Sequence, residues 1–392
     1  MPTTHTPTAG TYRPASLGEK LIPRSYTRWV KQTAWAVAIA NIVLIISGGV
    51  VRLTGSGLGC DAWPRCTSDG SWTTTPEMGI HGMVEFGNRL LTFVLVAVTV
   101  IAFLAVLRVV FPERVTLGRF IWGLLVGSRS DSFRAQGLGA WLESRGFVAP
   151  HSRYSDLFNL TLLLLWGIPV QAVVGGISVW LRLNPWMITA HYMLSALMIM
   201  IAGIYLNRVY RYFEGTAARE GIVPATDPAH APTQGADAGT PASAHLMRVL
   251  GWVGVVLVVA LMFMGTVTTG TGPHAGDAET HRHAFNPVWV TRLHGSLVWI
   301  YCASVLGFFA LWRSKGWAPI FGKSLVFVLA VLGYQAIVGY TQYFNGLPIW
   351  LVEMHLIGSG VFALAASSLF ERQLVLSSPA AREKAAGRVR TA

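Results

Sequence analysis

The chain alternates between long apolar stretches and shorter polar ones. Eight stretches of about twenty residues are almost wholly apolar, without the polar–apolar alternation that a β-strand would show. A run of this length spans a bilayer as a helix, because only helices and closed barrels satisfy their backbone hydrogen bonds in lipid. The pattern predicts an all-α integral membrane protein with transmembrane helices near 34–53, 86–109, 157–180, 186–207, 247–268, 291–312, 324–344 and 349–370.

The composition agrees with this class. Of the 392 residues, 53% are hydrophobic and only 12% are charged, which is about half the charged fraction of a soluble domain. The net charge of +12 could indicate nucleic-acid binding. However, most lysines and arginines fall before the first predicted helix and after every second one. This asymmetry is the positive-inside bias, which predicts a cell-membrane protein with both termini in the cytoplasm and no nucleic-acid partner. Residues 1–30 contain no apolar core, so we expect no cleaved signal peptide.

One phrase occurs twice in the chain. Gln171-Ala-Val-Val-Gly is followed by Trp186 and His191, and Gln335-Ala-Ile-Val-Gly is followed by Trp350 and His355 with the same spacing. The ends of the first and fifth predicted helices are also alike, being rich in glycine and threonine. The repeat pairs helices 1–4 with helices 5–8. Because four spans is an even number, the two four-helix bundles should be parallel and related by a pseudo-twofold axis along the membrane normal.

Two inserts interrupt this pattern on the cytoplasmic side. Residues 110–156 contain a short apolar stretch, Phe120–Val126, that is too short to span and is expected at the membrane interface. Residues 214–245 are rich in Ala, Pro, Gly, Thr and Asp, which is typical of a flexible linker. The predicted organisation is an N-terminal segment 1–32, an N-terminal half 33–210, a linker 211–245, a C-terminal half 246–372 and a basic tail 373–392.

Ionisable residues inside a membrane are costly and are therefore candidates for function. The candidates are His81, Glu85, Arg89, His191, Arg292, His294, Glu353 and His355. A single histidine in a helix is more often a packed residue than a ligand, but these recur at corresponding places on alternate helices. Imidazole binds zinc, copper or haem iron. Zinc or copper would require three or four converging ligands, whereas two histidines from different helices fit the two faces of a haem.

The two halves differ in their candidate ligands. His294 and His355 form a complete axial pair for a haem b in the C-terminal half. In the N-terminal half His191 matches His355, but the position in the second predicted helix that should match His294 is less clear. A haem in this half has either one firm ligand or His81 as its second. An incompletely ligated iron would leave room for chemistry.

Three polar residues of the second predicted helix share one face. His81, Glu85 and Asn88 follow one another at i, i+4 and i+7. Glu85 could take up or relay protons, and its alternative role is a structural ion pair with Arg89. The alternative role of Asn88 is that of a polar residue at the start of the helix.

The chain has three cysteines. Cys60 and Cys66 lie in the first outer loop, where an oxidising environment allows a disulfide; two free thiols are the alternative. Cys302 is expected to pack as a small apolar residue. No Cys-x-x-Cys-His motif occurs, so a haem would not be attached covalently by that route.

Several separated motifs occur in the order found in one known family. They are Gly-Gly-Val-Val-Arg-Leu-Thr-Gly-Ser-Gly-Leu-Gly-Cys at 48–60, Asp-Ala-Trp-Pro-Arg-Cys at 61–66, Glu-Phe-Gly-Asn-Arg at 85–89, Asn-Pro-Trp with a following His at 184–191, Gly-Thr-Gly-Pro-His-Ala-Gly-Asp at 270–277, and both Gln-Ala phrases. With these motifs the chain resembles the haem A synthase family over about 33–372, apart from the two inserts. The resemblance implies a membrane oxidoreductase that converts haem O to haem A for cytochrome c oxidase. The reaction oxidises the methyl group at ring position 8 to a formyl group by successive hydroxylations.

The resemblance also implies roles for individual residues. His294 and His355 would be the axial ligands of a resident haem b, His191 a ligand of the substrate haem, Glu85 the catalytic glutamate, and Cys60 with Cys66 a disulfide. One departure concerns Asn88, because many members of the family have Glu-x-x-His-Arg where this chain has Glu-Phe-Gly-Asn-Arg. The implied partners are haem O, haem O synthase, cytochrome c oxidase assembly factors, an unidentified electron partner and membrane lipid. A homo-oligomer is left open.

Two other classes of protein share some of these features. A transmembrane di-haem b cytochrome that only passes electrons would have the same histidine pairs but no need for Glu85 or an unequal first half. A parallel-repeat transporter could use the histidines as substrate or proton contacts, and it would be colourless.

Overall fold

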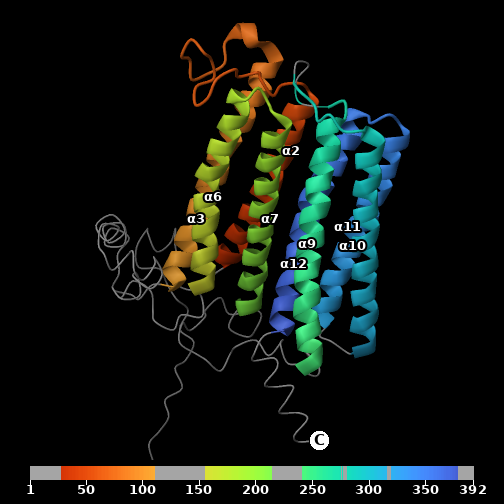
Figure 1. Ribbon diagram of the computed structural model, residues 1–392. Helices are drawn as coiled ribbons and strands as arrows, with labels where there is room; N and C mark the ends of the chain where they lie inside the picture. Colours follow the sequence, from red (N-terminus) through yellow and green to blue (C-terminus); the bar gives the residue numbers. More distant parts are fainter. Residues whose placement is uncertain are drawn as a thin grey trace, which may run out of the picture.

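The computed structural model describes residues 28–110, 155–213, 241–274, 276, 280–315 and 319–377. These residues form eight long helices and contain no strand. All eight are long and apolar enough to cross a membrane, so the prediction of an all-α, multi-pass membrane fold is confirmed. The elements are α2 (Arg28–Leu53), η1 (Pro76–Met78, a 3₁₀ helix), α3 (Gly79–Val110), α6 (Ser155–Trp180), α7 (Pro185–Phe213), α9 (Pro241–Thr271), α10 (Pro287–Lys315), α11 (Pro319–Phe344) and α12 (Ile349–Leu376) (Figure 1).

The helices extend beyond the apolar runs that predict them. α3 begins at Gly79, so it includes His81 and Glu85, and α9 begins at Pro241, within the segment expected to be a linker. A helix continues past the hydrocarbon region because each added residue makes its own backbone hydrogen bond, whatever its side chain. Four helices begin at a proline, which is favoured in the first turn. Most of the 110–156 insert, the rest of the linker, Phe120–Val126 and the tail from 378 lie outside the described residues.

The two halves have the same order of helix contacts. In the N-terminal half, α2, α3, α6 and α7 form a closed ring in which each helix packs on the next. In the C-terminal half, α9, α10, α11 and α12 form a ring in the same order. α7 and α12 pack on each other between the rings, flanked by α2 against α12 and α7 against α9 (Figure 1). The internal repeat predicts this equivalence; the twofold axis itself stays a prediction.

Polar contacts join the halves at different depths. Away from the short loops, Arg208 on α7 pairs with Asp156 on α6 (Nη1–Oδ2, 3.1 Å) and with the buried Glu371 on α12 (Nε–Oε1, 3.1 Å). Nearer the loops, the hydroxyl of Tyr192 on α7 donates to Ser359 Oγ on α12 at 2.6 Å. These links fix α7 and α12 relative to each other along their length.

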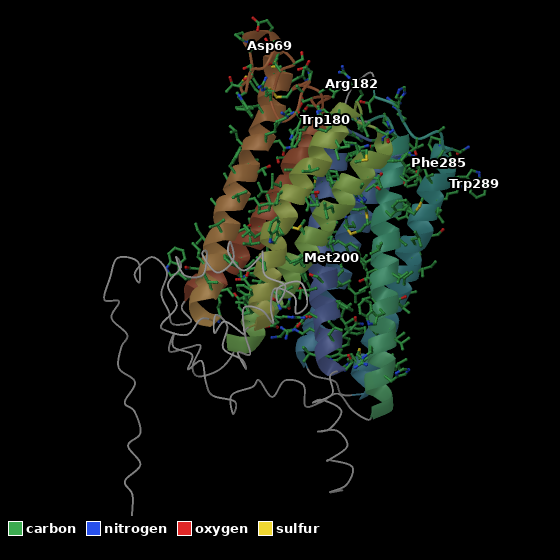
Figure 2. The ribbon with its side chains drawn as sticks, turned by 60° about the vertical axis from the view of Figure 1, so that its left-hand side comes forward. Asp69, Trp180, Arg182, Met200, Phe285 and Trp289 are labelled. Atoms are coloured by element: carbon green, nitrogen blue, oxygen red, sulfur yellow. A yellow bond between two sulfur atoms is a disulfide. The ribbon has the colours of Figure 1, made fainter. Side chains whose placement is uncertain are left out.

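The described residues of the short connections at 54–78, 181–184, 272–286 and 345–348 all lie at one end of the bundle, here called the loop end (Figure 1). In the first of them Cys60 and Cys66 are disulfide-bonded and buried, so the predicted disulfide is confirmed and the free-thiol alternative is wrong. Trp63 packs edge-on against Trp180 at the end of α6, and its carbonyl oxygen accepts a hydrogen bond of 3.0 Å from the Trp180 indole. Trp180 is labelled in Figure 2. Cys302 is a free thiol packed against the apolar core, as expected.

The loop at 272–286 carries a buried histidine. His283 is only 6% exposed and lies 4.4 Å from the ring of Trp186 on α7, with Phe285 beside it. Its backbone N–H donates to the carbonyl of Gly270 at 3.1 Å. Burial, and then the charge of Arg52, lower the pKa of His283 below its ordinary value.

This environment predicts a pH dependence of stability. A histidine whose pKa is lowered by folding takes up its proton more readily in the unfolded state. Its contribution is fully present above the unfolded pKa of about 6.5 and is lost as the pH falls from there toward the folded pKa. His283→Phe keeps an aromatic ring in the cluster, so we expect a weaker fall in thermal midpoint between pH 7 and pH 5 than in the wild type. Equal slopes for both proteins would contradict this role, and the exposed His281→Phe is the control.

Candidate functional site

Three histidines within the helices, His191, His294 and His355, have the same local environment. Each lies near the loop end of its helix and packs on a glycine of the preceding helix. A Cβ atom added to that glycine would lie 3.0 to 3.2 Å from the imidazole Cε1 atom in every case. The pairs are His191 with Gly175, His294 with Gly265, and His355 with Gly339.

The repeated Gln-Ala phrase explains two of these contacts. Gln171 Nε2 donates to the backbone carbonyl of His191 at 2.9 Å, and Gln335 Nε2 donates to that of His355 at 3.1 Å. The last residue of each phrase, Gly175 or Gly339, is the glycine on which the ring lies. The glutamine therefore holds the backbone of the histidine, and the glycine one turn later leaves room for its ring. The sequence predicts the repeat from its constant spacing. It does not predict that the glutamine and the glycine contact the histidine.

The imidazoles are not fully engaged by protein groups. Nδ1 of each of the three histidines is buried without a hydrogen-bond partner, although each residue as a whole is only half-buried. An unpartnered buried polar atom costs about 1–3 kcal/mol. The accessible part of each residue thus lies on atoms other than Nδ1.

The positions of the helices suit a haem. In the C-terminal ring α10, which carries His294, and α12, which carries His355, lie opposite each other. Among the described residues no group of three or more His, Cys, Asp and Glu side chains could hold a metal ion. The porphyrin of a haem supplies four nitrogen ligands to the iron, so the protein supplies only the axial ligands. The C-terminal ring thus offers two imidazoles on facing helices, the number of protein ligands that a haem with two axial ligands takes.

The matching place in the N-terminal half lacks an imidazole. Gly48 lies five residues before the end of α2, as Gly175 does in α6, but a Cβ on Gly48 would meet nothing within 4 Å. On the facing helix, Asn88 Oδ1 accepts a hydrogen bond from Ser47 Oγ at 2.5 Å. α3, which carries Asn88, lies opposite α7 and His191 in the ring. The two candidate sites are thus equivalent in position but unequal in ligands.

Glu85 is part of a polar clasp on the disulfide loop. One carboxylate oxygen accepts from the backbone N–H of Cys60 at 2.6 Å, and the other accepts from Arg89 at 2.6 Å. Arg89 also donates to the carbonyls of Ala62 (3.0 Å) and Arg65 (2.9 Å). The Glu85–Arg89 ion pair, which the sequence offered as an alternative role for Glu85, is present. Both side chains also form hydrogen bonds with the backbone of the disulfide loop. A role in proton transfer stays a prediction.

The remaining sequence candidates are dispersed. His81 is exposed and shares a hydrogen bond of 2.9 Å with Ser56 in the loop, which is unlike the setting of the three half-buried histidines. Arg292 is exposed near the loop end of α10. Both carboxylate oxygens of Glu353 are buried without a hydrogen-bond partner, and the side chain contacts Gly49 of α2.

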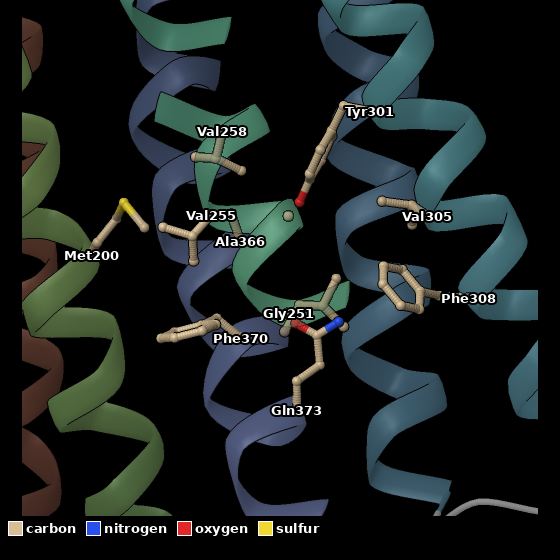
Figure 3. Close-up of a pocket in the computed structure, with 12 residues that line it drawn as sticks. Met200, Gly251, Val255, Val258, Tyr301, Val305, Phe308, Ala366, Phe370 and Gln373 are labelled. Carbon is tan, nitrogen blue, oxygen red and sulfur yellow. The ribbon is translucent and has the colours of Figure 1, made fainter. Parts of the chain in front are cut away.

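A small cavity lies farther from the loop end, between α9, α10 and α12. Tyr301, two turns beyond His294 on α10, points its hydroxyl into it, and the amide of Gln373 on α12 faces that hydroxyl (Figure 3). The cavity has a volume of about 10 Å³, which is room for about one water molecule. It is distinct from the histidine sites and too small for a cofactor.

No protein-family model matches this chain, and no curated protein matches it either. The assignment of the site therefore rests on its own residues and their geometry.

The glycines under the histidine rings predict the effect of an added methyl group. In Gly339→Ala the new Cβ would press on His355, so we expect a loss of about 1–3 kcal/mol in stability, the usual cost of overpacking. Gly333→Ala in the same helix is the matched control, since a Cβ there meets nothing within 4 Å and alanine favours a helix. Thermal unfolding of the two full-length variants checks this. Equal midpoints would show that the ring is not held against Gly339.

Proposed function

We propose that this protein is a haem A synthase that oxidises the position-8 methyl group of haem O to a formyl group. The observation that carries the proposal is the inequality of two equivalent sites. One has two imidazoles on opposite helices, and the other has one imidazole, an amide and open space beside Gly48.

The C-terminal site would hold a resident haem b without a covalent link. His294 and His355 would be its two axial ligands, and Gln335 would hold the His355 turn in place. When bound, a bis-histidine haem has no open coordination position and supplies one-electron transfer.

The N-terminal site would receive haem O as the substrate. His191 would bind the substrate iron on one side, and Asn88 is a poor iron ligand on the other. With water as the source of oxygen, each hydroxylation would replace a C–H bond by a C–O bond and release two protons and two electrons. The first gives the alcohol, and the second gives a geminal diol that loses water to form the aldehyde. Glu85 would accept protons at the loop end, where its carboxylate pairs with Arg89 at 2.6 Å. The electrons would pass to an unidentified partner.

A di-haem b cytochrome that passes electrons without changing a haem remains the alternative. It would explain His294 and His355 equally well. It would not require an N-terminal site with a single imidazole, which favours the synthase. The proposed location is the cell membrane, with both termini cytoplasmic and the loop end facing outward, in keeping with the positive-inside pattern.

The pigments of the protein test this proposal. We expect protein purified from cells that make haem O to contain haem B together with haem A or its hydroxylated precursor, separated by chromatography of the acid-extracted pigments. Haem B alone would support the electron-transfer cytochrome, and a colourless protein would support a transporter.

A further inference from the structure

Two serines occupy equivalent positions after the histidines of the last helix in each half, yet their hydroxyls bond differently. Ser195 lies one turn after His191, donates to the His191 carbonyl at 3.0 Å and is also bonded by the Gln171 amide. All these contacts stay within the N-terminal half.

Ser359, one turn after His355, makes a contact that crosses between the halves. It accepts a hydrogen bond of 2.6 Å from the hydroxyl of Tyr192, and its own proton goes to the carbonyl of Leu356 at 2.5 Å. Tyr192 is the residue directly after His191. The residue at its equivalent place after His355 is Leu356, which has no polar group to return the contact. The link is therefore one-sided, from the N-terminal half to the C-terminal half.

We propose that Tyr192 is a positioning residue shared by the two histidine sites. It is joined to His191 by a peptide bond, and through Ser359 it holds the helical turn that begins at His355. α7 and α12 pack directly on each other, so the Tyr192–Ser359 bond lies within a continuous contact between the two helices. A change at the His191 site, such as binding of a haem, is passed to the His355 ring and alters the iron that this ring holds. This inference rests on the proposed function.

The test uses full-length protein in lipid nanodiscs carrying haem b. The reduction potential and the electron paramagnetic resonance signal of haem b are recorded before and after hemin is added as the probe for the N-terminal site. In the wild type we expect hemin to shift both. In Tyr192→Phe and in Ser359→Ala the shift is lost at unchanged haem b content, and the double variant loses no more than either single one. Ser304→Ala on α10, whose hydroxyl donates to the Ile300 carbonyl of its own helix, is the control and keeps the shift.

The outcomes separate the two claims. A shift of wild-type size in Tyr192→Phe or Ser359→Ala, or no shift in the wild type, overturns the role of Tyr192 and leaves the proposed function standing. Wild-type protein without haem b overturns the proposed function and the inference together. A general loss of stability would lower haem b content in all variants, but it would not abolish the response of the haem that remains bound.

Discussion

His294→Ala and His355→Ala each deprive the purified protein of its haem b. The two rings lie on opposite helices of the C-terminal ring, so neither can replace the other. Changes in the residues around metal ligands already weaken metal binding by about 10–100-fold, and loss of a ligand itself should cost at least as much. We therefore expect haem b content to fall at least tenfold in both variants, measured by the pyridine haemochrome spectrum per mole of protein.

The control for this result is another histidine. His281 is exposed in the loop before α10, so His281→Ala should leave haem b content unchanged. If His355→Ala retained haem b at full occupancy, the ligand assignment would be wrong, and the Gln335 and Gly339 contacts would be purely structural.

The second large effect is expected from Glu85→Gln. Glutamine has the size of glutamate, and its carbonyl oxygen can still accept one hydrogen bond from Cys60 or Arg89. It cannot accept a proton as a carboxylate does. Loss of a general acid–base group lowers rates by about 10²–10⁴-fold, so we expect haem A production to fall at least a hundredfold. The ratio of haem A to haem O in extracted pigments measures it.

A second measurement separates chemistry from structure in this variant. Cys60 and Cys66 are buried, so thiol labelling after treatment with a reductant reports whether the loop stays closed. Glu85→Gln should remain protected, whereas Arg89→Gln, which loses donors to three loop carbonyls, should become labelled. Simultaneous loss of activity and protection in Glu85→Gln would make Glu85 a structural residue only.

Much of the fold could be predicted from the sequence because lipid allows so few solutions. An apolar run of sufficient length must be helical, and the eight runs correspond to the eight long helices. The helix ends were less predictable, since polar residues such as those around His81 extend a helix without any apolar signal. The start of α9 at Pro241 is an example.

The candidate site was predicted in part. The doubled phrase correctly indicated equivalent environments for His191 and His355, because repeated residues at constant spacing make repeated contacts. The glycine beneath each ring, the Ser47–Asn88 bond and the clasp on the loop backbone were not foreseen. These contacts join residues on different helices or loops, and their partners depend on how the helices pack rather than on any local pattern.

The central claim is that the N-terminal site changes a haem while the C-terminal site keeps one. The most direct test incubates the purified protein in nanodiscs with haem O and an electron acceptor, and follows the haem products by mass spectrometry. The account predicts a hydroxymethyl derivative followed by the formyl derivative, haem A, with haem b chemically unchanged. Recovery of unaltered haem O, while haem b is reduced and reoxidised normally, would contradict it and identify an electron-transfer cytochrome instead.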